Sequence, residues 1–361
     1  MKEKLPQSTL HEKEGIPPPD IFSKASMERI THFRKMQPSS NELINAIIDK
    51  DKVALSRAIT LIESTNLDHL NKANEVISGC LSFANKSVRI GITGVPGVGK
   101  STFIESFGTF LTSIGKKVAV LAVDPSSSLS HGSILGDKTR MEELVKNENA
   151  FIRPSASGAT LGGVARKTRE AIILCEAAGF DVILIETVGV GQSETAVHSM
   201  VDFFLLLKIS GAGDELQGIK RGIMEMADAI VINKADGDNI NKAKLAKTEF
   251  SRALHLFPPK KSGWQPEVST CSAIESNGIE AIWDTMERYF YLVKDNNYFE
   301  SNRQNQSQFW MMETINDQLK GNFYSHSMVK ESLVELKKLV ADDKISPFSA
   351  ASKLLSIYFE K

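Results

Sequence analysis

The stretch Gly94-Val95-Pro96-Gly97-Val98-Gly99-Lys100-Ser101 follows an apolar run at 88–93 and precedes a helical pattern at 102–114. A strand, a glycine-rich loop, Lys-Ser and a helix, in this order, form the context in which the pattern G-x-x-x-x-G-K-[ST] binds phosphate. The glycines let backbone N–H groups approach phosphate oxygens, and the helix N-terminus adds unpaired donors. The stretch therefore predicts that this loop and Thr102 bind a nucleoside triphosphate, with Lys100 on the β- and γ-phosphates and Ser101 on Mg²⁺.

Apolar runs alternate with helical patterns along the middle of the chain. The runs lie at 88–93, 118–123, 150–152, 181–185, 202–209 and 229–232, and a weaker one lies at 267–271. Runs as apolar as these are typical of a parallel sheet that is covered by helices on both faces. The predicted fold class is therefore α/β with a mostly parallel, doubly covered sheet, and its nucleotide site should lie at the C-terminal ends of the strands.

Polar and helical segments flank this predicted sheet domain, which we place at 87–297. Residues 1–40 are polar and contain Pro17-Pro18-Pro19, which predicts a mobile arm. Three amphipathic patterns predict an N-terminal helical region at 41–86. After residue 297 the strand pattern stops, and three helical patterns rich in aromatic residues and leucine predict a helical tail at 298–361. This tail either packs on the sheet domain or forms an oligomerisation arm.

Composition places limits on compartment and partners. The 361 residues carry a formal net charge of -1, which gives no basic field for nucleic acid or for an anionic membrane. The three cysteines, Cys80, Cys175 and Cys271, are far apart and odd in number, which favours a reducing compartment. The N-terminal stretch has no apolar core typical of a secretory signal, and no apolar run approaches the length of a membrane span. We therefore expect a cytoplasmic protein.

A second motif selects the base of the nucleotide. The run at 229–232 ends in Asn233-Lys234-Ala235-Asp236, the N-K-x-D pattern. A carboxylate accepts hydrogen bonds from both N1–H and the exocyclic amine of guanine, whereas adenine would leave the Asp236 charge unpaired. Asn233 and Lys234 should brace the loops and lie along the base, and Ser272-Ala273-Ile274 should donate a backbone N–H to guanine O6. These motifs predict GTP and GDP as ligands.

The run at 181–185 leads into Glu186-Thr187-Val188-Gly189, where many GTPases have D-x-x-G. The acid of that pattern acts on Mg²⁺ through water, and the glycine N–H contacts the γ-phosphate. Val190 stands where some GTPases place the glutamine that orients the attacking water, and Gln192 lies nearby but out of that register. The sequence therefore predicts slow hydrolysis until a partner completes the site, with Lys100, Glu186 and Gln192 as candidate catalytic residues.

Two further polar segments follow strands at the expected nucleotide edge. Asp124, directly after the run at 118–123, and Asp137 are hard oxygen ligands available to Mg²⁺ beside Ser101. Lys138 and Arg140 are candidate transition-state cations or partner contacts. The segment at 211–222 is dense in glycine and charge, which predicts a mobile element that responds to the nucleotide or to a partner.

Several long strings resemble one family. They are GVPGVGKST, VDPSS, SILGDKTRM, LGGVARKTRE, ETVGVGQSE and GAGDELQGIKRGIMEMADAIVINKAD, and they resemble the MeaB/ArgK family of GTPase chaperones of adenosylcobalamin-dependent methylmalonyl-CoA mutase. The resemblance covers about residue 40 to the end. It implies a GTPase fold of the MinD and signal-recognition-particle class, a homodimer joined through C-terminal helices, and a role in gating cobalamin delivery to the mutase and protecting that enzyme.

The resemblance also assigns residues. Asp124, Asp137 and Glu186 match the family's Mg²⁺ and switch carboxylates. Asp214, Gln217 and Lys220 fall in its third switch, which couples mutase binding to hydrolysis, and Lys220 joins the candidate catalytic residues. Two departures concern the switches, since His131-Gly132-Ser133 replaces Gly-Gly before Ser-Ile-Leu, and Ile209-Ser210 replaces Leu-Pro.

Three other functions remain open on the sequence. A nickel-insertion GTPase would need clustered cysteine and histidine, and the seven histidines here are scattered. A kinase tied to amino-acid transport is a label that this family has carried. A non-enzymatic GTP sensor has the same motifs as a slow GTPase. The client, whether methylmalonyl-CoA mutase or a sister acyl-CoA mutase, is not specified by any motif.

Overall fold

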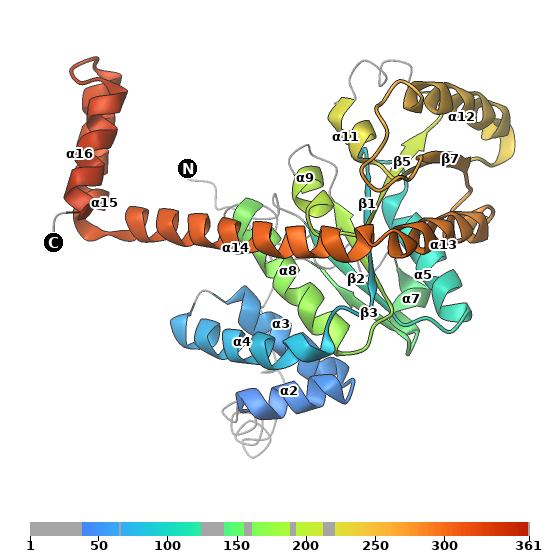
Figure 1. Ribbon diagram of the computed structural model, residues 1–361, viewed down its shortest axis with the longest axis horizontal. Coiled ribbons are helices and arrows are strands. Elements are labelled where there is room, and N and C mark those ends of the chain that lie inside the picture. Colours follow the sequence, from blue (N-terminus) through green and yellow to red (C-terminus); the bar gives the residue numbers. More distant parts are fainter. Residues whose placement is uncertain are drawn as a thin grey trace, which may run out of the picture.

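The computed structural model describes residues 38–64, 66–123, 141–154, 161–187, 193–211 and 221–359. Within these residues the centre is a seven-stranded sheet in the order β3-β2-β4-β1-β5-β6-β7, and every neighbouring pair is parallel (Figure 1). The predicted α/β class with a parallel sheet is confirmed. The strands are β1 (Val88–Gly94), β2 (Val118–Val123), β3 (Ala150–Arg153), β4 (Val182–Thr187), β5 (Phe203–Ile209), β6 (Ala229–Asn233) and β7 (Glu267–Thr270).

Helices precede, separate and follow these strands. In the described residues they are α2 (Ser40–Ile48), α3 (Lys52–Glu63), α4 (Leu67–Cys80), α5 (Lys100–Ser113), α7 (Glu142–Lys146), α8 (Leu161–Ala177), α9 (Ser193–His198), α11 (Arg221–Met226), α12 (Ile240–Leu254), α13 (Ile279–Asp295), α14 (Tyr298–Ser325), α15 (Ser327–Ala341) and α16 (Pro347–Phe359). Short 3₁₀ turns occupy Leu81–Phe83 and Gly237–Asn239. Residues 1–37, where the sequence predicts an arm, lie outside the described part of the chain.

Four strands, β1, β3, β4 and β6, end one or two residues later than the apolar runs predict, and the extensions of β4 and β6 contain motif side chains. β4 includes Glu186 and Thr187, because its pairing with β2 continues to the partners Val123 and Thr187. β6 likewise includes Asn233, which pairs with Ile209 of β5. Both motif residues, Glu186 and Asn233, therefore belong to the sheet, and ladder hydrogen bonds fix their backbones.

Helices cover both faces of the sheet. Successive residues of β4 point to opposite faces, so Val182 and Leu184 pack in one core while Ile183 and Ile185 pack in the other. The first core contains side chains of α5, α7 and α13, and the second contains those of α8 and α9. Burial on both sides explains why the strands read as continuous apolar runs.

The N-terminal helices α2, α3 and α4 pack against α8, which itself covers one face of the sheet. Side chains of α2, α3 and α4 share the second core with α8, and this helical region lies below the sheet in Figure 1. Ser39 and Glu42 form a capping box at the start of α2, which satisfies free N–H groups of its first turn. Asp51 caps α3 by accepting hydrogen bonds from Val53 and Ala54.

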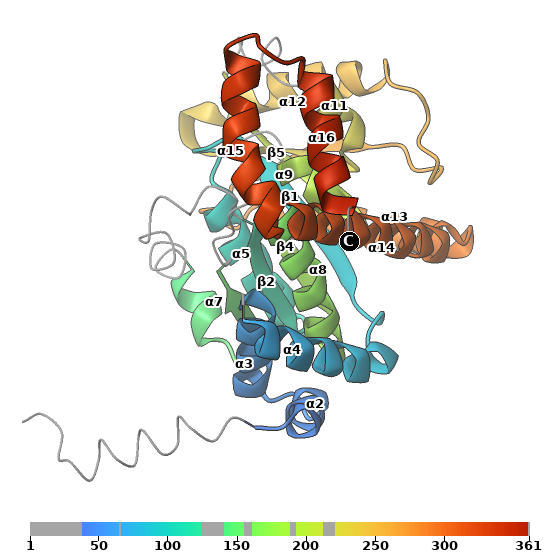
Figure 2. The same cartoon turned by 90° about the vertical axis from the view of Figure 1, so that its left-hand side faces the viewer.

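The C-terminal helices extend away from the sheet. α14 has 28 residues, which makes it about 42 Å long. Its first half lies against the sheet domain, and α15 and α16 form a hairpin beyond its far end (Figures 1 and 2). That hairpin has a small core of its own, formed by Val329, Leu336, Ala350 and Leu354.

A buried ionic network holds the first half of α14 on the domain. Arg303 donates through Nε and Nη2 to the carboxylate of Asp202, at 2.9 and 2.7 Å. Arg89 of β1 donates to both oxygens of Glu176 on α8, and its backbone N–H donates to Asp202. Trp310 adds an indole hydrogen bond to the carbonyl oxygen of Ser199. The network joins β1, α8, the start of β5 and α14 at the N-terminal ends of the central strands, whereas the phosphate loop follows the C-terminal end of β1.

Two structural observations concern the cysteines and the possible membrane-spanning helices. The three cysteines are free and buried. Among the described helices, none is both long enough and apolar enough to cross a membrane.

Candidate functional site

The phosphate loop connects β1 to α5, as the sequence predicts. β1 ends at Gly94 and α5 begins at Lys100. A Cβ on Gly94 would lie 2.6 Å from the carbonyl oxygen of Leu207 in the neighbouring strand, so the loop can begin there only without a side chain. Gly99 has φ +90°, and a Cβ on it would lie 2.9 Å from Nδ2 of Asn233. Both glycines are therefore required by close approach of the backbone as well as by dihedral angle.

Lys100 is folded back over its own loop. Its Nζ donates to the carbonyl oxygens of Gly94 and Val95, at 2.8 and 3.2 Å, and the side chain is 9% exposed. Burial lowers the pKa of the Lys100 ammonium, whereas the carboxylates of Glu186 and Glu194 favour its charged form. The ammonium is thus held at the mouth of the loop, between backbone carbonyls and two carboxylates.

Glu194 is a residue that the sequence analysis did not select. It lies in the first turn of α9 and is 3% exposed, although glutamate is seldom buried to that extent. Its charge acts on Lys100 from a different element than that of Glu186. The only sequence signal was its place within ETVGVGQSE, because the run itself carries no pattern that marks a buried carboxylate.

Ser101, in the first turn of α5, and Glu186, on β4, lie close together. The Ser101 hydroxyl lies 3.5 Å from Oε1 of Glu186. Next to them the hydroxyl of Thr187 donates to that of Thr93 at 2.8 Å, and both threonines are buried. A hydroxyl and a carboxylate are hard oxygen donors, so this pair has the chemistry that Mg²⁺ prefers.

Asn233 links three segments of the site. Its Nδ2 donates to the carbonyl oxygen of Val98 at 2.9 Å, while its Oδ1 accepts from the backbone N–H of Ala273 at 3.2 Å and from the thiol of Cys271. Lys234, with φ +59°, extends its Nζ to the carbonyl oxygen of Gly97 at 2.8 Å. The N-K-x-D segment is therefore bound directly to the phosphate loop, as the bracing role predicts.

Asp236 and the 272–274 segment also lie together. The hydroxyl of Ser272 donates to Oδ2 of Asp236 at 2.6 Å and accepts from the backbone N–H of Glu275 at 3.2 Å. This contact fixes the carboxylate plane of Asp236. Ala273 is buried, and its backbone N–H donates to Oδ1 of Asn233, whereas Ile274 is 78% exposed.

The structure therefore brings together all the predicted site residues that it describes. Those residues are Gly94, Val95, Pro96, Gly97, Val98, Gly99, Lys100, Ser101, Thr102, Glu186, Asn233, Lys234, Asp236, Ser272, Ala273 and Ile274. The remaining candidates lie outside the described residues, namely Asp124, Asp137, Gly189, Gln192, Asp214, Gln217 and Lys220.

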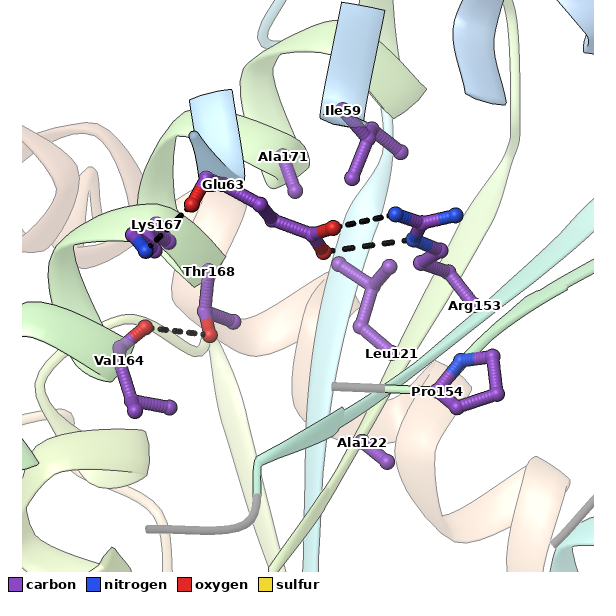
Figure 3. A pocket seen from close by; sticks show the side chains of 10 residues that line it. All are labelled: Ile59, Glu63, Leu121, Ala122, Arg153, Pro154, Val164, Lys167, Thr168 and Ala171. Atoms are coloured by element: carbon purple, nitrogen blue, oxygen red, sulfur yellow. Dashed lines mark hydrogen bonds and ion pairs between the residues drawn. The ribbon is translucent and has the colours of Figure 1, made fainter. Parts of the chain in front are cut away.

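A small pocket lies near the ends of β2 and β3, between α3 and α8 (Figure 3). Its volume of about 20 Å³ is the space of a single water molecule, which excludes it as a nucleotide site. The guanidinium of Arg153 forms an ion pair with Glu63 on one side, and Nζ of Lys167 donates to the carbonyl oxygen of Glu63 at 2.7 Å. These contacts attach the C-terminal end of α3 to the sheet domain.

The phosphate loop at the end of a central parallel strand, bound to an N-K-x-D segment at the end of another, defines this protein as a P-loop GTPase. Its family follows from comparison with known proteins. The chain belongs to the MeaB family, since the family model described as "Methylmalonyl Co-A mutase-associated GTPase MeaB" matches residues 55–328.

Relatives and a solved structure agree with this membership. A protein of Mycobacterium tuberculosis named as a probable GTPase is 48% identical over 315 residues, which cover 87% of this chain and 94% of the relative. The Mus musculus protein named "Methylmalonic aciduria type A homolog, mitochondrial" is 43% identical over 334 residues, which cover 90% and 80%. The crystal structure titled "LAO/AO transport system kinase" is 36% identical, with a TM-score of 0.71 and coverage of 88% and 97%.

Proposed function

We propose that this protein is a GTP-hydrolysing chaperone of an adenosylcobalamin-dependent acyl-CoA mutase, of which methylmalonyl-CoA mutase is the first candidate. In this role it gates cobalamin loading and protects or reactivates the mutase. The observation that carries the proposal is the match of the mutase-associated GTPase family over residues 55–328, which include both nucleotide motifs and the glycine-rich segment at 211–222.

Guanine selection is assigned to the edge formed by β6 and β7. Asp236 accepts from N1–H and the exocyclic amine of guanine, with Ser272 holding its carboxylate plane. Asn233 and Lys234 hold the phosphate loop at a fixed distance from that carboxylate through Val98 and Gly97. An adenine would leave the carboxylate unpaired, and this accounts for selection of GTP and GDP.

Phosphate chemistry is assigned to the loop after β1. In hydrolysis, water attacks the γ-phosphorus, the bond to the β,γ-bridging oxygen breaks, and GDP, inorganic phosphate and a proton are released. Lys100 exchanges its contacts with Gly94 and Val95 for the β- and γ-phosphate oxygens. Ser101 and Glu186, with Asp124 and Asp137, fit as oxygen donors for Mg²⁺, which neutralises charge on the phosphates when bound.

Turnover without a partner is proposed to be slow. Val190 carries no group that can orient water, and Gln192 is displaced by two positions from the register in which a glutamine performs that task. Asp214, Gln217 and Lys220 are the residues through which a bound mutase would complete the site, with Lys220 as the cation. Their positions in the glycine-rich segment support this role by sequence alone.

The C-terminal helices are assigned as a homodimerisation arm spanning 298–361. The second half of α14 presents Met311, Met312, Ile315 and Leu319, with exposed fractions of 42–57%. Apolar side chains exposed along one helix are typical of a surface that a protein partner covers. The remaining assigned units are the arm at 1–40, the helical region at 41–86 and the GTPase domain at 87–297. The proposed compartment is the cytoplasm.

Addition of purified methylmalonyl-CoA mutase tests the chaperone role. GTP turnover by this protein should rise severalfold at saturating mutase, and Lys100→Ala should abolish both basal and stimulated turnover. An unchanged rate at saturating mutase, with the mutase shown to be active, would overturn the assignment of this client.

The solved relative is named as a transport system kinase, and this keeps phosphotransfer to a protein as a second candidate. GTP labelled at the γ-phosphate separates the two. A GTPase releases the label as inorganic phosphate. A kinase transfers the label to a protein, and the label then stays attached during denaturing electrophoresis.

A further inference from the structure

A chain of hydrogen bonds runs from the end of β5 to the phosphate loop. The hydroxyl of Ser210 donates to Oδ1 of Asn239 at 2.6 Å. Nδ2 of Asn239 donates to the carbonyl oxygen of Lys234, also at 2.6 Å. Nζ of Lys234 then donates to the carbonyl oxygen of Gly97 at 2.8 Å. These hydrogen bonds connect three segments that are separate in sequence, namely residue 210, residues 234–239 and residue 97.

Ser210 determines which way the Asn239 carboxamide points. A carboxamide has one acceptor end and one donor end, and a hydroxyl that donates to the oxygen turns the NH₂ group the opposite way. In this structure the opposite way leads to the Lys234 carbonyl. The backbone N–H of Asn239 donates to the carbonyl oxygen of Asp236 at 2.9 Å, which holds the residue close to the N-K-x-D segment.

Lys234 needs such support because its backbone is strained. Its φ of +59° lies in the left-handed region, which costs a non-glycine residue on the order of 1–2 kcal/mol. The side chain is exposed, so surrounding packing does not enforce this conformation. Two hydrogen bonds hold the chain in this conformation: Nδ2 of Asn239 donates to the Lys234 carbonyl oxygen, and the backbone N–H of Ala235 donates to the carbonyl oxygen of Cys271 at 2.9 Å.

We propose that Ser210 and Asn239 are positioning residues for nucleotide binding, which hold Lys234 in its left-handed conformation and thereby keep the phosphate loop and the guanine-reading loop in register. The inference rests on the proposed reading of guanine by the 233–236 segment. It also gives a role to Ser210, where the family resemblance predicts proline, because proline has no hydroxyl to donate.

The test measures nucleotide affinity and steady-state kinetics of the full chain. Ser210→Ala and Asn239→Ala should each weaken binding of fluorescent GDP about three- to tenfold, the range expected for one hydrogen bond. KM for GTP should rise by a similar factor while kcat stays within about twofold. Ser210→Thr, which keeps the hydroxyl, should bind like the wild type.

A double variant shows whether Ser210 affects GDP affinity through Asn239, as the first member of a hydrogen-bonded relay from Ser210 through Asn239 to Lys234, or independently of it. If Ser210 acts only through Asn239, the double variant Ser210→Ala/Asn239→Ala binds GDP as Asn239→Ala does. Ser251→Ala is the matched control, since it removes a serine hydroxyl that donates to the Lys247 carbonyl on α12 at 2.8 Å, and its affinity should be unchanged.

Two results would overturn the proposal. One is wild-type affinity and KM in Ser210→Ala, and the other is a double variant whose loss equals the product of the two single losses. Asn239→Asp provides a variant of the same size that keeps the acceptor for Ser210 but loses the donor to Lys234. It should bind GDP at least as weakly as Asn239→Ala, because a carboxylate oxygen then faces the Lys234 carbonyl oxygen. A wild-type protein with no preference for GTP over ATP would instead refute base reading by Asp236, and the affinity comparison among these variants would still decide the relay.

Discussion

Asn233 at the end of β6 donates its Nδ2 hydrogen to the carbonyl oxygen of Val98 in the phosphate loop, at 2.9 Å and across 135 positions of the chain. The side chain is 1% exposed, and Gly99 leaves the space that it occupies. Through this contact the end of β6, which precedes the guanine-reading carboxylate, and the loop that binds phosphate form one rigid unit.

Replacement of Asn233 should therefore affect both binding and folding. Asn233→Ala leaves the Val98 carbonyl and the Ala273 N–H buried without a partner, which costs about 1–3 kcal/mol. We expect GDP affinity to fall at least tenfold in a fluorescence titration, and the free energy of unfolding in urea to fall by that amount. Asn241→Ala, at an exposed position of α12, is the control and should change neither quantity.

Asp236→Asn should change which base is bound. The variant presents an NH₂ group where guanine offers donors, so the preference for GTP over ATP should fall by more than tenfold. Xanthosine triphosphate, which carries a carbonyl oxygen in place of the exocyclic amine, should bind the variant better than GTP does. Competition titrations measure both ratios, with the exposed neighbour Asp238→Asn as control. An equal loss of affinity for GTP and ATP would contradict base reading.

Two arginine variants separate a buried ionic contact from an exposed one. Arg303→Met leaves Asp202 and Glu176 buried with less compensating charge, so the free energy of unfolding should fall by about 3–5 kcal/mol. Arg288→Met breaks the Glu267 ion pair, whose two side chains are 59% and 42% exposed, and should cost at most about 1 kcal/mol. Chemical denaturation of both variants checks the difference. Equal losses in the two variants would mean that the buried contacts of Arg303 stabilise the fold no more than the exposed Arg288–Glu267 ion pair does.

The same network predicts a dependence on pH. Burial alone would raise the pKa of Glu176, but the charge and hydrogen bonds of Arg89, with the charge of Arg303, outweigh it and hold that pKa below its ordinary value. A carboxyl whose pKa is lowered by folding stabilises the native state above its unfolded pKa of about 4.3. That contribution is lost as the pH falls through the lower folded pKa.

The measurement compares the unfolding free energies of the wild type and Glu176→Gln between pH 7 and pH 3. The difference between the two should be constant near neutrality and should shrink as the solution becomes acidic. A difference that does not change over this range would show that Glu176 keeps its ordinary pKa in the folded protein.

Much of the fold was predictable, because the apolar pattern of each strand and helix is local in sequence. The seven strands correspond to the seven apolar runs, since a strand buried on both faces must be apolar throughout its length. Where strands end was less predictable. Glu186 and Asn233 belong to β4 and β6 because neighbouring strands continue to pair with them, and pairing partners are not visible in a single run.

The site was predictable where function imposes a spaced motif, and not elsewhere. Lys100, Ser101 and Asp236 are marked by the motifs that contain them. Glu194 carries no such mark, because its importance comes from burial beside Lys100. Ser210 was visible only as a departure from the family, and the hydrogen bond that gives it a role has its acceptor 29 positions away.

The sequence by itself therefore determined the α/β class, the phosphate loop and the guanine motif, because each depends on residue type at fixed spacing within a short segment. Only the tertiary structure decided which distant side chains hold these motifs together. The hydrogen bonds from Asn233 to Val98, from Ser210 to Asn239 and from Arg303 to Asp202 join segments 29 to 135 positions apart. Such pairs depend on how parallel strands and helices are brought side by side, and that arrangement is a property of the whole packed chain.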